Sequence, residues 1–305
     1  MVQVGRSKRW GIVLAGGDGK RLLPLTRRIA GDDRPKQFCA LTGGETLLQS
    51  TLRRVSRVVP ERRTLLVLTR THEAYYREQL SHIRKRNLLE QPYNLGTAPA
   101  ITMSLTRLGV IAPDAVAGIF PSDHHFESDE AFAASMDAAF AYAEWFPERV
   151  ILLGVAAESA EEAYGWIEPG EKLAVDVGTV FAVRRFWEKP HKETAERLME
   201  MGCLWNSFVM VGRVSSFLNL VRQSVPGMVQ SFERMWTTAV PHTERAAVNE
   251  LYARIPSGNF SEEVLSARTS QLAVMPARGL RWTDLGEPRR VYAALGSIGT
   301  AEYGA

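Results

Sequence analysis

Short apolar runs alternate with helix-like patterns through the first half of this chain. The runs are rich in Val, Ile and Leu and show no regular alternation with polar residues, which is typical of strands buried on both faces. They lie at Gly11–Ala15, Leu65–Leu68, Val116–Phe120 and Val150–Val155. Strands that alternate with helices predict an α/β fold, with a doubly wound, mostly parallel, Rossmann-like sheet flanked by helices.

Two helices are indicated between these runs. Thr46 and Gln49 stand at the spacing of a capping box, and apolar residues from Leu48 to Val59 then recur on one helical face. A second apolar stripe runs from Phe132 to Ala143. We interpret both stripes as core-facing sides of helices that cover the sheet.

The pattern changes from about Tyr164, where short strand-like pieces lie between turns. Strands are expected at Val175–Val183, Leu204–Val211 and Gln271–Met275, and helices at Lys192–Met201, Val214–Arg222 and Thr243–Arg254. The sequence contains no internal repeat, low-complexity tract or obvious linker. We therefore predict a single domain over residues 1–305. Residues 1–160 form one half, and residues 161–305 add a smaller antiparallel portion and C-terminal helices as the other wall of a cleft.

Composition excludes several classes of protein. Hydrophobic residues make up 45% of the 305 residues, which is enough to form a large buried core. A net charge of +3 from 37 basic and 34 acidic residues gives no reason to expect a nucleic-acid partner. Cys39 and Cys203 lack disulfide or zinc-ribbon spacing and are interpreted as buried thiols. The apolar run after the N-terminus is too short for a signal peptide or a membrane span, so we expect a cytoplasmic protein without a membrane partner.

A small-residue turn, LAGGDGKRLLPLT, begins at Leu14 at the carboxyl end of the first apolar run. Its glycines let the backbone approach a ligand closely, with N–H groups directed at phosphate oxygens. Cations follow at Lys20, Arg21 and, in the segment RPKQF, Lys36. The turn lacks the Ser or Thr of a Walker loop and the third glycine of GxGxxG. It nevertheless predicts a site that holds a nucleoside triphosphate by its phosphates.

Two carboxylates are candidates for a metal site beside this turn. Asp123 follows the run Val116–Phe120 in PSDHH, and Asp284 lies in WTDLG. Taken alone, an Asp after a strand is more often a turn former or helix cap than a ligand. Beside a phosphate loop, however, one or two carboxylates are what Mg²⁺ requires, and Mn²⁺ is the alternative ion. The pair His124 and His125 suggests zinc only weakly, because no further ligands stand at a suitable spacing.

Eight segments together resemble the sugar-1-phosphate nucleotidyltransferase family, and most closely its bacterial mannose-1-phosphate guanylyltransferase (GDP-mannose pyrophosphorylase) group. They occur in the family's order and extend from Leu14 to Gly286, which is nearly the whole chain. The segments are LAGGDGKRLLPLT, RPKQF, QPYNLGTAPAI, PSDHH, YGWIEPG, FWEKP, LWNS and WTDLG. A single such motif would be weak evidence, but eight in sequence are specific.

The resemblance implies a nucleotide-diphospho-sugar transferase-like fold and a reaction. A nucleoside triphosphate and a hexose 1-phosphate would give a nucleotide sugar and pyrophosphate, with GTP, mannose 1-phosphate and GDP-mannose as the leading expectation. The alternatives are dTTP or UTP with glucose 1-phosphate, or a sugar-nucleotide sensor that binds without turnover. A homodimer is compatible with the resemblance, which does not fix the oligomeric state.

The same resemblance implies roles for individual residues. The nucleotide would be bound by Leu14, Ala15, Gly16, Gly17, Gly19, Lys20, Arg21, Gln91, Gly96 and Thr97. The sugar would meet Gly165, Glu188, Lys189 and Asn206. Arg21, Lys36, Asp123 and Asp284 would be catalytic, with the two Asp residues holding the metal. Within this set, Arg21 would clamp the β- and γ-phosphates, and Lys36 would bridge the α-phosphate and the sugar phosphate.

Two positions depart from the family's pattern. Leu95 stands where Arg is common, beside the turn expected to meet the base, and Phe208 stands where Gly usually follows WNS. A bulky side chain at the second position should narrow or reshape the sugar pocket, because Gly permits a close approach that Phe blocks. Both changes bear on substrate preference and leave the phosphate and metal positions intact.

Overall fold

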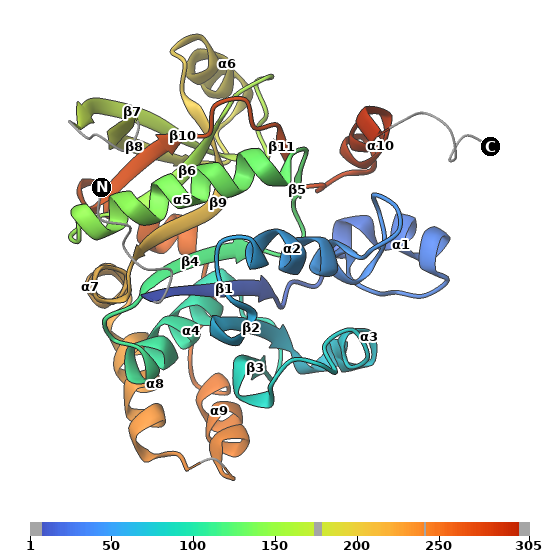
Figure 1. Ribbon diagram of the computed structural model, residues 1–305, viewed down its shortest axis with the longest axis vertical. Helices are drawn as coiled ribbons and strands as arrows, with labels where there is room; N and C mark the ends of the chain where they lie inside the picture. Colours follow the sequence, from blue (N-terminus) through green and yellow to red (C-terminus); the bar gives the residue numbers. More distant parts are fainter. Residues whose placement is uncertain (1–7, 174–178, 241, 299–305) are drawn as a thin grey trace.

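The apolar runs of the first half form the centre of a large mixed sheet (Figure 1). The computed structural model of the chain describes residues 8–173, 179–240 and 242–298. In these residues the nine-stranded sheet has the order β3-β2-β1-β4-β9-β6-β10-β8-β7. The strands are β1 Arg9–Ala15, β2 Thr64–Thr69, β3 Leu88–Gln91, β4 Val116–Pro121, β6 Val150–Ala156, β7 Gly165–Leu173, β8 Val180–Glu188, β9 Leu204–Arg213 and β10 Leu272–Pro276.

The strand directions confirm a mostly parallel sheet with a smaller antiparallel portion. β1 pairs in parallel with β2 and β4, β2 with β3, and β10 with β6. β9 and β8 run against the others, because their pairings with β4, β6, β7 and β10 are antiparallel. Of the strand expected at Val175–Val183, residues 175–178 lie outside the described residues, and β8 begins at Val180.

Helices cover both faces of the sheet. They are α1 Leu23–Ala30, α2 Leu47–Ser56, α3 Glu73–Tyr76, α4 Thr97–Ile111, α5 Asp129–Trp145, α6 Lys192–Glu200, α7 Val214–Ser224, α8 Pro226–Thr238, α9 Glu244–Tyr252 and α10 Pro288–Ile298. The predicted capping box begins α2, where Thr46 Oγ1 accepts from Gln49 N at 3.2 Å and Gln49 Oε1 accepts from Thr46 N at 2.9 Å. None of the helices in the described parts of the chain is long and apolar enough to span a membrane.

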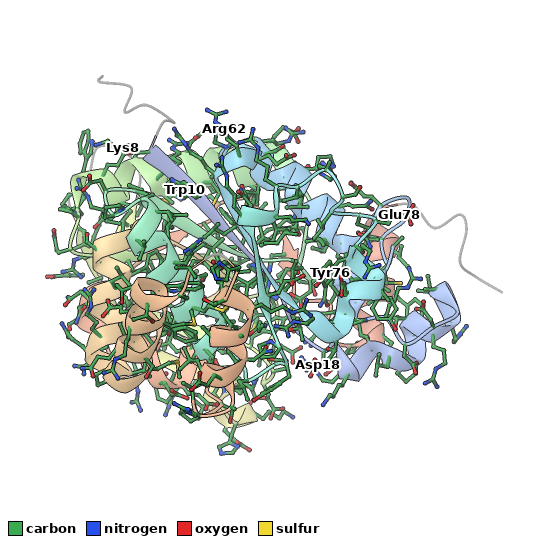
Figure 2. The ribbon with its side chains drawn as sticks, turned by 90° about the horizontal axis from the view of Figure 1, so that it is seen from below. Lys8, Trp10, Asp18, Arg62, Tyr76 and Glu78 are labelled. Carbon is green, nitrogen blue, oxygen red and sulfur yellow. The ribbon has the colours of Figure 1, made fainter. Side chains whose placement is uncertain are left out.

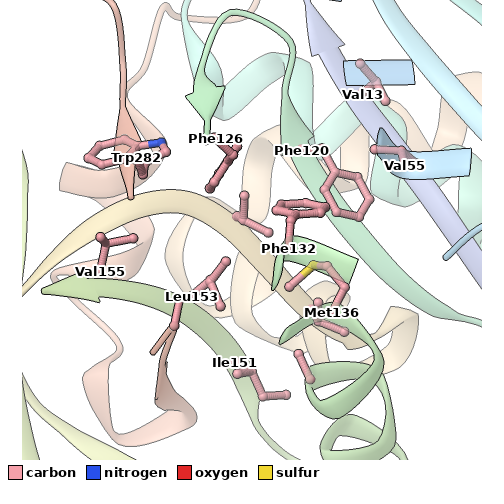
Figure 3. Close-up of a cluster of buried hydrophobic side chains, with 14 of the residues drawn as sticks. Val13, Val55, Phe120, Phe126, Phe132, Met136, Ile151, Leu153, Val155 and Trp282 are labelled. Atoms are coloured by element: carbon pink, nitrogen blue, oxygen red, sulfur yellow. The ribbon is translucent and has the colours of Figure 1, made fainter. Parts of the chain in front are cut away.

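Successive residues of the central strands point into two different cores. Val13 of β1 and Phe120 of β4 face α2 and α5, where they pack with Phe132 and Met136 (Figure 3). Ile12 and the other neighbours in sequence face the opposite way, toward α4, α7 and α8. This alternation between two apolar environments explains why the strands read as continuous hydrophobic runs. The predicted buried thiols, Cys39 and Cys203, are both buried and free.

A two-stranded ladder and a third small core bring the C-terminal segment to the edge of the sheet. β5, His125–Phe126, pairs with β11, Trp282–Thr283. Leu285 and Val291 pack with Leu22 and Leu25 near α1, so α10 is held against the N-terminal half. As a result, Asp284 arrives next to the carboxyl end of β4 although most of the chain separates the two in sequence.

Candidate active site

A cleft of about 450 Å³ opens along the carboxyl ends of the parallel strands. Ligands of doubly wound folds bind at this edge, because loops diverge there and leave a crevice. Predicted residues that line it are Leu14, Gly16, Gly17, Arg21, Gln91, Gly96, Thr97, Asp123, Gly165, Glu188, Lys189, Asn206 and Asp284. The other predicted residues, Ala15, Gly19, Lys20 and Lys36, do not form its walls, but they belong to the segments that shape it.

Lys36 contacts both of the residues predicted to hold the metal, Asp123 through its carboxylate and Asp284 through its backbone carbonyl. It lies in a single 3₁₀ turn, Lys36–Phe38, and is only 7% exposed. Its Nζ lies 3.2 Å from Asp123 Oδ2 and donates a hydrogen bond to the backbone carbonyl of Asp284. One buried ammonium therefore holds both segments at the same place. The expected meeting of Asp123 and Asp284 at one site is seen in the structure.

The environment of Asp123 favours its charged form. Burial opposes ionisation, but the Lys36 ammonium outweighs it and keeps the pKa of Asp123 below its ordinary value. Burial also lowers the pKa of His124, so its ring is neutral at neutral pH. His124 Nε2 lies 3.6 Å from Asp123 Oδ1, and Trp282 Nε1 lies 3.2 Å from His124 Nδ1. His124 lines the cleft, whereas the sequence suggested it only weakly, as part of a zinc pair with His125.

Arg290 orients Asp284 and is a second residue that sequence reasoning missed. Its Nε lies 3.1 Å from Asp284 Oδ1, and its Nη1 lies 3.0 Å from Glu161 Oε2. The guanidinium also lies over the ring of Tyr164, 4.8 Å from its centroid. Arg21 approaches the other oxygen of Asp284 at 3.9 Å from the open side of the cleft. No local motif marks Arg290, because its partners come from distant segments.

The glycine turn is held by hydrogen bonds to its carbonyl groups. Gln37 Nε2 donates to the carbonyls of Ala15 at 3.2 Å and Gly17 at 2.7 Å, and Thr69 Oγ1 donates to that of Gly16 at 2.8 Å. With its carbonyls held in this way, the turn can direct N–H groups at a ligand. A Cβ at Gly16 would lie 2.2 Å from Gln91 Nε2, so a larger residue there would displace the Gln91 amide from its bond to Thr69.

Gln91 supports the glycine turn through Thr69, whose hydroxyl donates to the Gly16 carbonyl. Its Nε2 donates to Thr69 Oγ1 at 3.1 Å, and its Oε1 accepts from Tyr252 OH at 3.0 Å. The residue is 1% exposed, although it contributes to the cleft wall. Its carbonyl oxygen is thus already engaged by Tyr252. The amide group keeps one N–H for a ligand.

Two chain segments form the side of the cleft where the base is expected. Gly96 has φ +95°, and a Cβ there would lie 2.3 Å from the carbonyl oxygen of Gly258. Gly258 N donates to the Leu95 carbonyl at 2.9 Å, and Phe260 N donates to Thr97 Oγ1 at 2.9 Å. Three cleft residues of this second segment were not expected from the sequence: Gly258, Asn259 and Ser261.

Polar groups of β7, β8 and β9 form the side predicted for the sugar. Glu188 Oε1 lies 3.3 Å from Lys189 Nζ, and Gly165 packs so close to Glu188 that a Cβ would lie 3.1 Å from its Oε2. Asn206 Oδ1 accepts from the backbone N of Phe208 at 3.1 Å. This bond leaves the Asn206 amide nitrogen as the donor that a sugar hydroxyl can meet.

Phe208 lies on a β-bulge at the wall of the cleft. Leu152 of β6 pairs with Met210, whereas Gly154 pairs with Asn206, so three residues of β9 stand opposite one of β6. Phe208 has φ +61°, a left-handed conformation that costs a residue with a Cβ about 1–2 kcal/mol. It lines the cleft in this conformation. Strain of this kind gathers at functional sites.

The donor set fits a hard divalent ion. Asp123 is 29% exposed at its side chain and Asp284 14%, and both line the cleft beside the glycine turn. In the described ranges, no group of three or more His, Cys, Asp or Glu residues is placed to hold a metal by protein ligands alone. Two carboxylates with the remaining positions left to phosphate oxygens and water suit Mg²⁺.

The chain belongs to the nucleotidyl transferase family, whose sequence model matches residues 10–299. Among its curated relatives, the mannose-1-phosphate guanylyltransferase of Escherichia coli K12 is 30% identical over 93% of this chain and 59% of its own length. The alginate biosynthesis protein AlgA of Pseudomonas syringae is 29% identical over 90% of this chain and 56% of its own length. The chain therefore spans less than two thirds of these relatives.

A solved structure supports the same assignment of fold. A crystal structure of a Thermus thermophilus protein, described as a mannose-1-phosphate geranyltransferase, superposes with a TM-score of 0.81. It is 29% identical, and the alignment covers 94% of this chain and 79% of that one. The family resemblance and the fold class expected from the sequence are thus confirmed.

Proposed function

We propose that this protein joins GTP and mannose 1-phosphate to give GDP-mannose and pyrophosphate. The observation that carries the proposal is the contact of the Lys36 ammonium with both the Asp123 carboxylate and the Asp284 backbone, beside the glycine turn. This arrangement gathers fixed cations and carboxylates where two phosphate groups would meet. The names of the relatives support GTP and mannose 1-phosphate as the substrates.

The chemistry requires charge neutralisation more than proton transfer. An oxygen of the sugar phosphate attacks the α-phosphorus in line, a new P–O bond forms, and the bond to the β-phosphate oxygen breaks with its electron pair leaving on pyrophosphate. A phosphate monoester with a second pKa near ~6 is largely dianionic at neutral pH, so the attacking oxygen needs no general base. Repulsion between two polyanions is the main barrier, and fixed positive charge lowers it.

In this scheme the residues around the glycine turn bind the phosphate groups of both substrates. The turn from Leu14 through Gly19 directs backbone N–H groups at the triphosphate, and Lys20 and Arg21 add positive charge toward the departing pyrophosphate. Lys36 stabilises negative charge at the α-phosphate and the incoming sugar phosphate. Asp123 and Asp284 hold Mg²⁺, with Mn²⁺ as the alternative. The bound ion supplies positive charge to the phosphate oxygens.

The other residues select the two substrates. Gln91, Gly96 and Thr97 meet the base, while Gly165 permits a close approach and Asn206 donates to the sugar. Glu188 accepts from a hydroxyl, and Lys189 neutralises the sugar phosphate. In this scheme residues 1–160 are the nucleotide-binding half of one domain, and residues 161–305 supply the sugar-binding half and the C-terminal helices.

A pyrophosphate-release assay tests the proposal. The five common nucleoside triphosphates are each combined with mannose 1-phosphate and glucose 1-phosphate in Mg²⁺, and the expected outcome is highest turnover with GTP and mannose 1-phosphate. Turnover only with dTTP or UTP and glucose 1-phosphate would keep the reaction class and change the substrates. Binding without release in every combination would identify a sensor and reject the enzymatic function.

A further inference from the structure

A second cavity of about 540 Å³ lies beside the edge strand β3, between α4, α8 and α9. We call it the basic pocket, and its cations are Arg70, Lys85, Arg86, Arg107 and Arg245. It shares no lining residue with the cleft described above. Figure 2 views the molecule from below the orientation of Figure 1, which is the side on which α8 and α9 lie.

Positive charge in the basic pocket exceeds the negative charge available to balance it. Its carboxylates are Glu90 and Glu244. Glu90 already accepts a hydrogen bond from Tyr76 OH at 2.8 Å, and Glu244 lies 3.6 Å from Arg107. Among the residues that the structure describes, no carboxylate lies within ion-pair distance of the pocket's four other cations: Arg70, Lys85, Arg86 and Arg245.

Buried guanidinium nitrogens in this pocket lack acceptors. Nε and Nη2 of Arg70 and Nε of Arg107 are shielded from solvent, yet they have no hydrogen-bond partner among the described residues. Arg70 uses only Nη1, which donates to Asn249 Oδ1 at 2.9 Å. Arg107 lies over the ring of Trp236 at 4.9 Å from its centroid. These shielded nitrogens do not open into the cavity, and it is the excess of cations among the lining residues that suits the pocket to an acceptor-rich group.

We propose that the basic pocket binds a small molecule carrying phosphate groups and that its occupancy alters nucleotide binding in the cleft. Planar guanidinium groups match phosphate oxygens in a bidentate manner, and charge-assisted hydrogen bonds are the strong ones. Trp236, Met103 and Val248 form an apolar wall for a carbon skeleton. The cavity volume is within the range of ordinary small-molecule sites.

A short chain of contacts links the basic pocket to the nucleotide turn. Arg70 bonds Asn249 of α9, and Tyr252, one helical turn further along α9, donates to Gln91 Oε1 at 3.0 Å. The Gln91 side-chain amide in turn packs directly against Gly16, where a Cβ would lie 2.2 Å from Gln91 Nε2. A ligand that draws Arg70 and α9 toward itself therefore acts on the residue that supports the turn. By linkage, the nucleotide must affect anion binding by the same factor.

The binding part of the proposal is tested without turnover and is independent of the proposed function. Equilibrium dialysis with radiolabelled inorganic phosphate at constant low ionic strength compares the wild type with Arg86→Gln/Arg245→Gln. Both residues are exposed, so folding should be preserved. The matched control is Arg62→Gln/Arg197→Gln, which removes the same charge from exposed positions that line neither cavity.

We expect the pocket variant to lose one class of bound phosphate, with affinity at least about tenfold weaker, since each lost charge-assisted contact is of that order. The control should bind as the wild type does. Arg107→Gln tests a half-buried contact in the same way. Equal phosphate binding by the wild type, the pocket variants and the control would overturn the proposal.

The coupling part is tested by kinetics. Phosphate also competes in the cleft, but it does so equally in the pocket variant and in the control. The difference between their plots of nucleotide KM against phosphate concentration therefore isolates the basic pocket. We expect a difference of at least about threefold at saturating phosphate, within the usual range of coupling energies. Coincident plots would reject the coupling.

Discussion

The two ends of the cleft differ in how they are built. The end proposed for the phosphates, which we call the phosphate end, consists of charged groups fixed at the carboxyl ends of central strands, where Lys36 contacts both the Asp123 and the Asp284 segments. The end proposed for the base and the sugar consists of segments brought in by loops and by the antiparallel strands, including the strained bulge at Phe208. The residues that depart from the family's pattern, Leu95 and Phe208, both belong to this second end.

The difference separates reaction type from substrate choice. Charge neutralisation at phosphorus needs a fixed geometry, which rigid strand ends supply. Recognition of a base and a sugar depends on shape and on a few hydrogen bonds, so it can change with loops and single side chains. Mutations at the phosphate end should therefore reduce turnover for every substrate, whereas mutations at the other end should change the ratio between substrates.

The largest expected effect follows from removing Lys36. Lys36→Ala should lower kcat by roughly 10²–10³, the scale for losing one preorganised charge-stabilising group. Pyrophosphate release measures the loss, and Lys36→Met keeps the aliphatic stem while removing the charge. The control is Lys192→Ala, whose side chain is 68% exposed on α6. A loss under threefold in both Lys36 variants, which circular dichroism must show to be folded, would remove Lys36 from the mechanism.

Arg290 should act through Asp284. Arg290→Met should raise the Mg²⁺ concentration needed for half-maximal activity by about 10-fold or more, because outer partners of metal ligands typically contribute 10–100-fold in affinity. Saturating Mg²⁺ should restore most of kcat. The neighbouring Arg289→Met is the control, since its side chain is 69% exposed and does not contact Asp284. An unchanged Mg²⁺ dependence in Arg290→Met would contradict the positioning role.

Phe208 should affect specificity rather than chemistry. Phe208→Gly enlarges the sugar side, so the ratio of kcat/KM for a 2-acetamido-hexose 1-phosphate to that for mannose 1-phosphate should rise about 10-fold. Phe208→Ala should broaden specificity similarly but be less stable than Phe208→Gly by about 1 kcal/mol, because only Gly relieves the left-handed backbone. Urea unfolding measures this difference. Equal ratios in wild type and both variants would show that the ring does not contact the sugar.

The smallest effect concerns acid stability. His72 is 8% exposed, and burial lowers its pKa although Asp18 lies 3.5 Å away. The unfolded chain therefore binds more protons than the folded one as pH falls below about 6.5, and the free energy of unfolding decreases there. His72→Gln should show a shallower decrease between pH 7 and 5 in urea titrations. A decrease as steep as that of the wild type in His72→Gln would contradict this contribution of His72.

Sequence patterns were sufficient for the features that depend on neighbouring residues. Runs such as Val116–Phe120 identify buried strands because each successive side chain meets one of two apolar layers. The capping box at Thr46 and the glycine turn are likewise local, since a few adjacent residues determine backbone direction. The residues proposed for the phosphate end could be located from the sequence because they occupy such motifs at the ends of strands, and their roles there stay predictions.

Only the tertiary structure decided which distant segments meet. Arg290 reaches Asp284 because α10 packs on the small core near α1, and residues from Gly258 onward reach Gly96 through backbone contacts that no local pattern encodes. The left-handed backbone of Phe208 arises from a bulge between β6 and β9, and the basic pocket gathers Arg70, Arg107 and Arg245 from separate elements. Such groupings depend on packing across the whole chain, whereas periodicity reports only the surroundings of each residue in its own element.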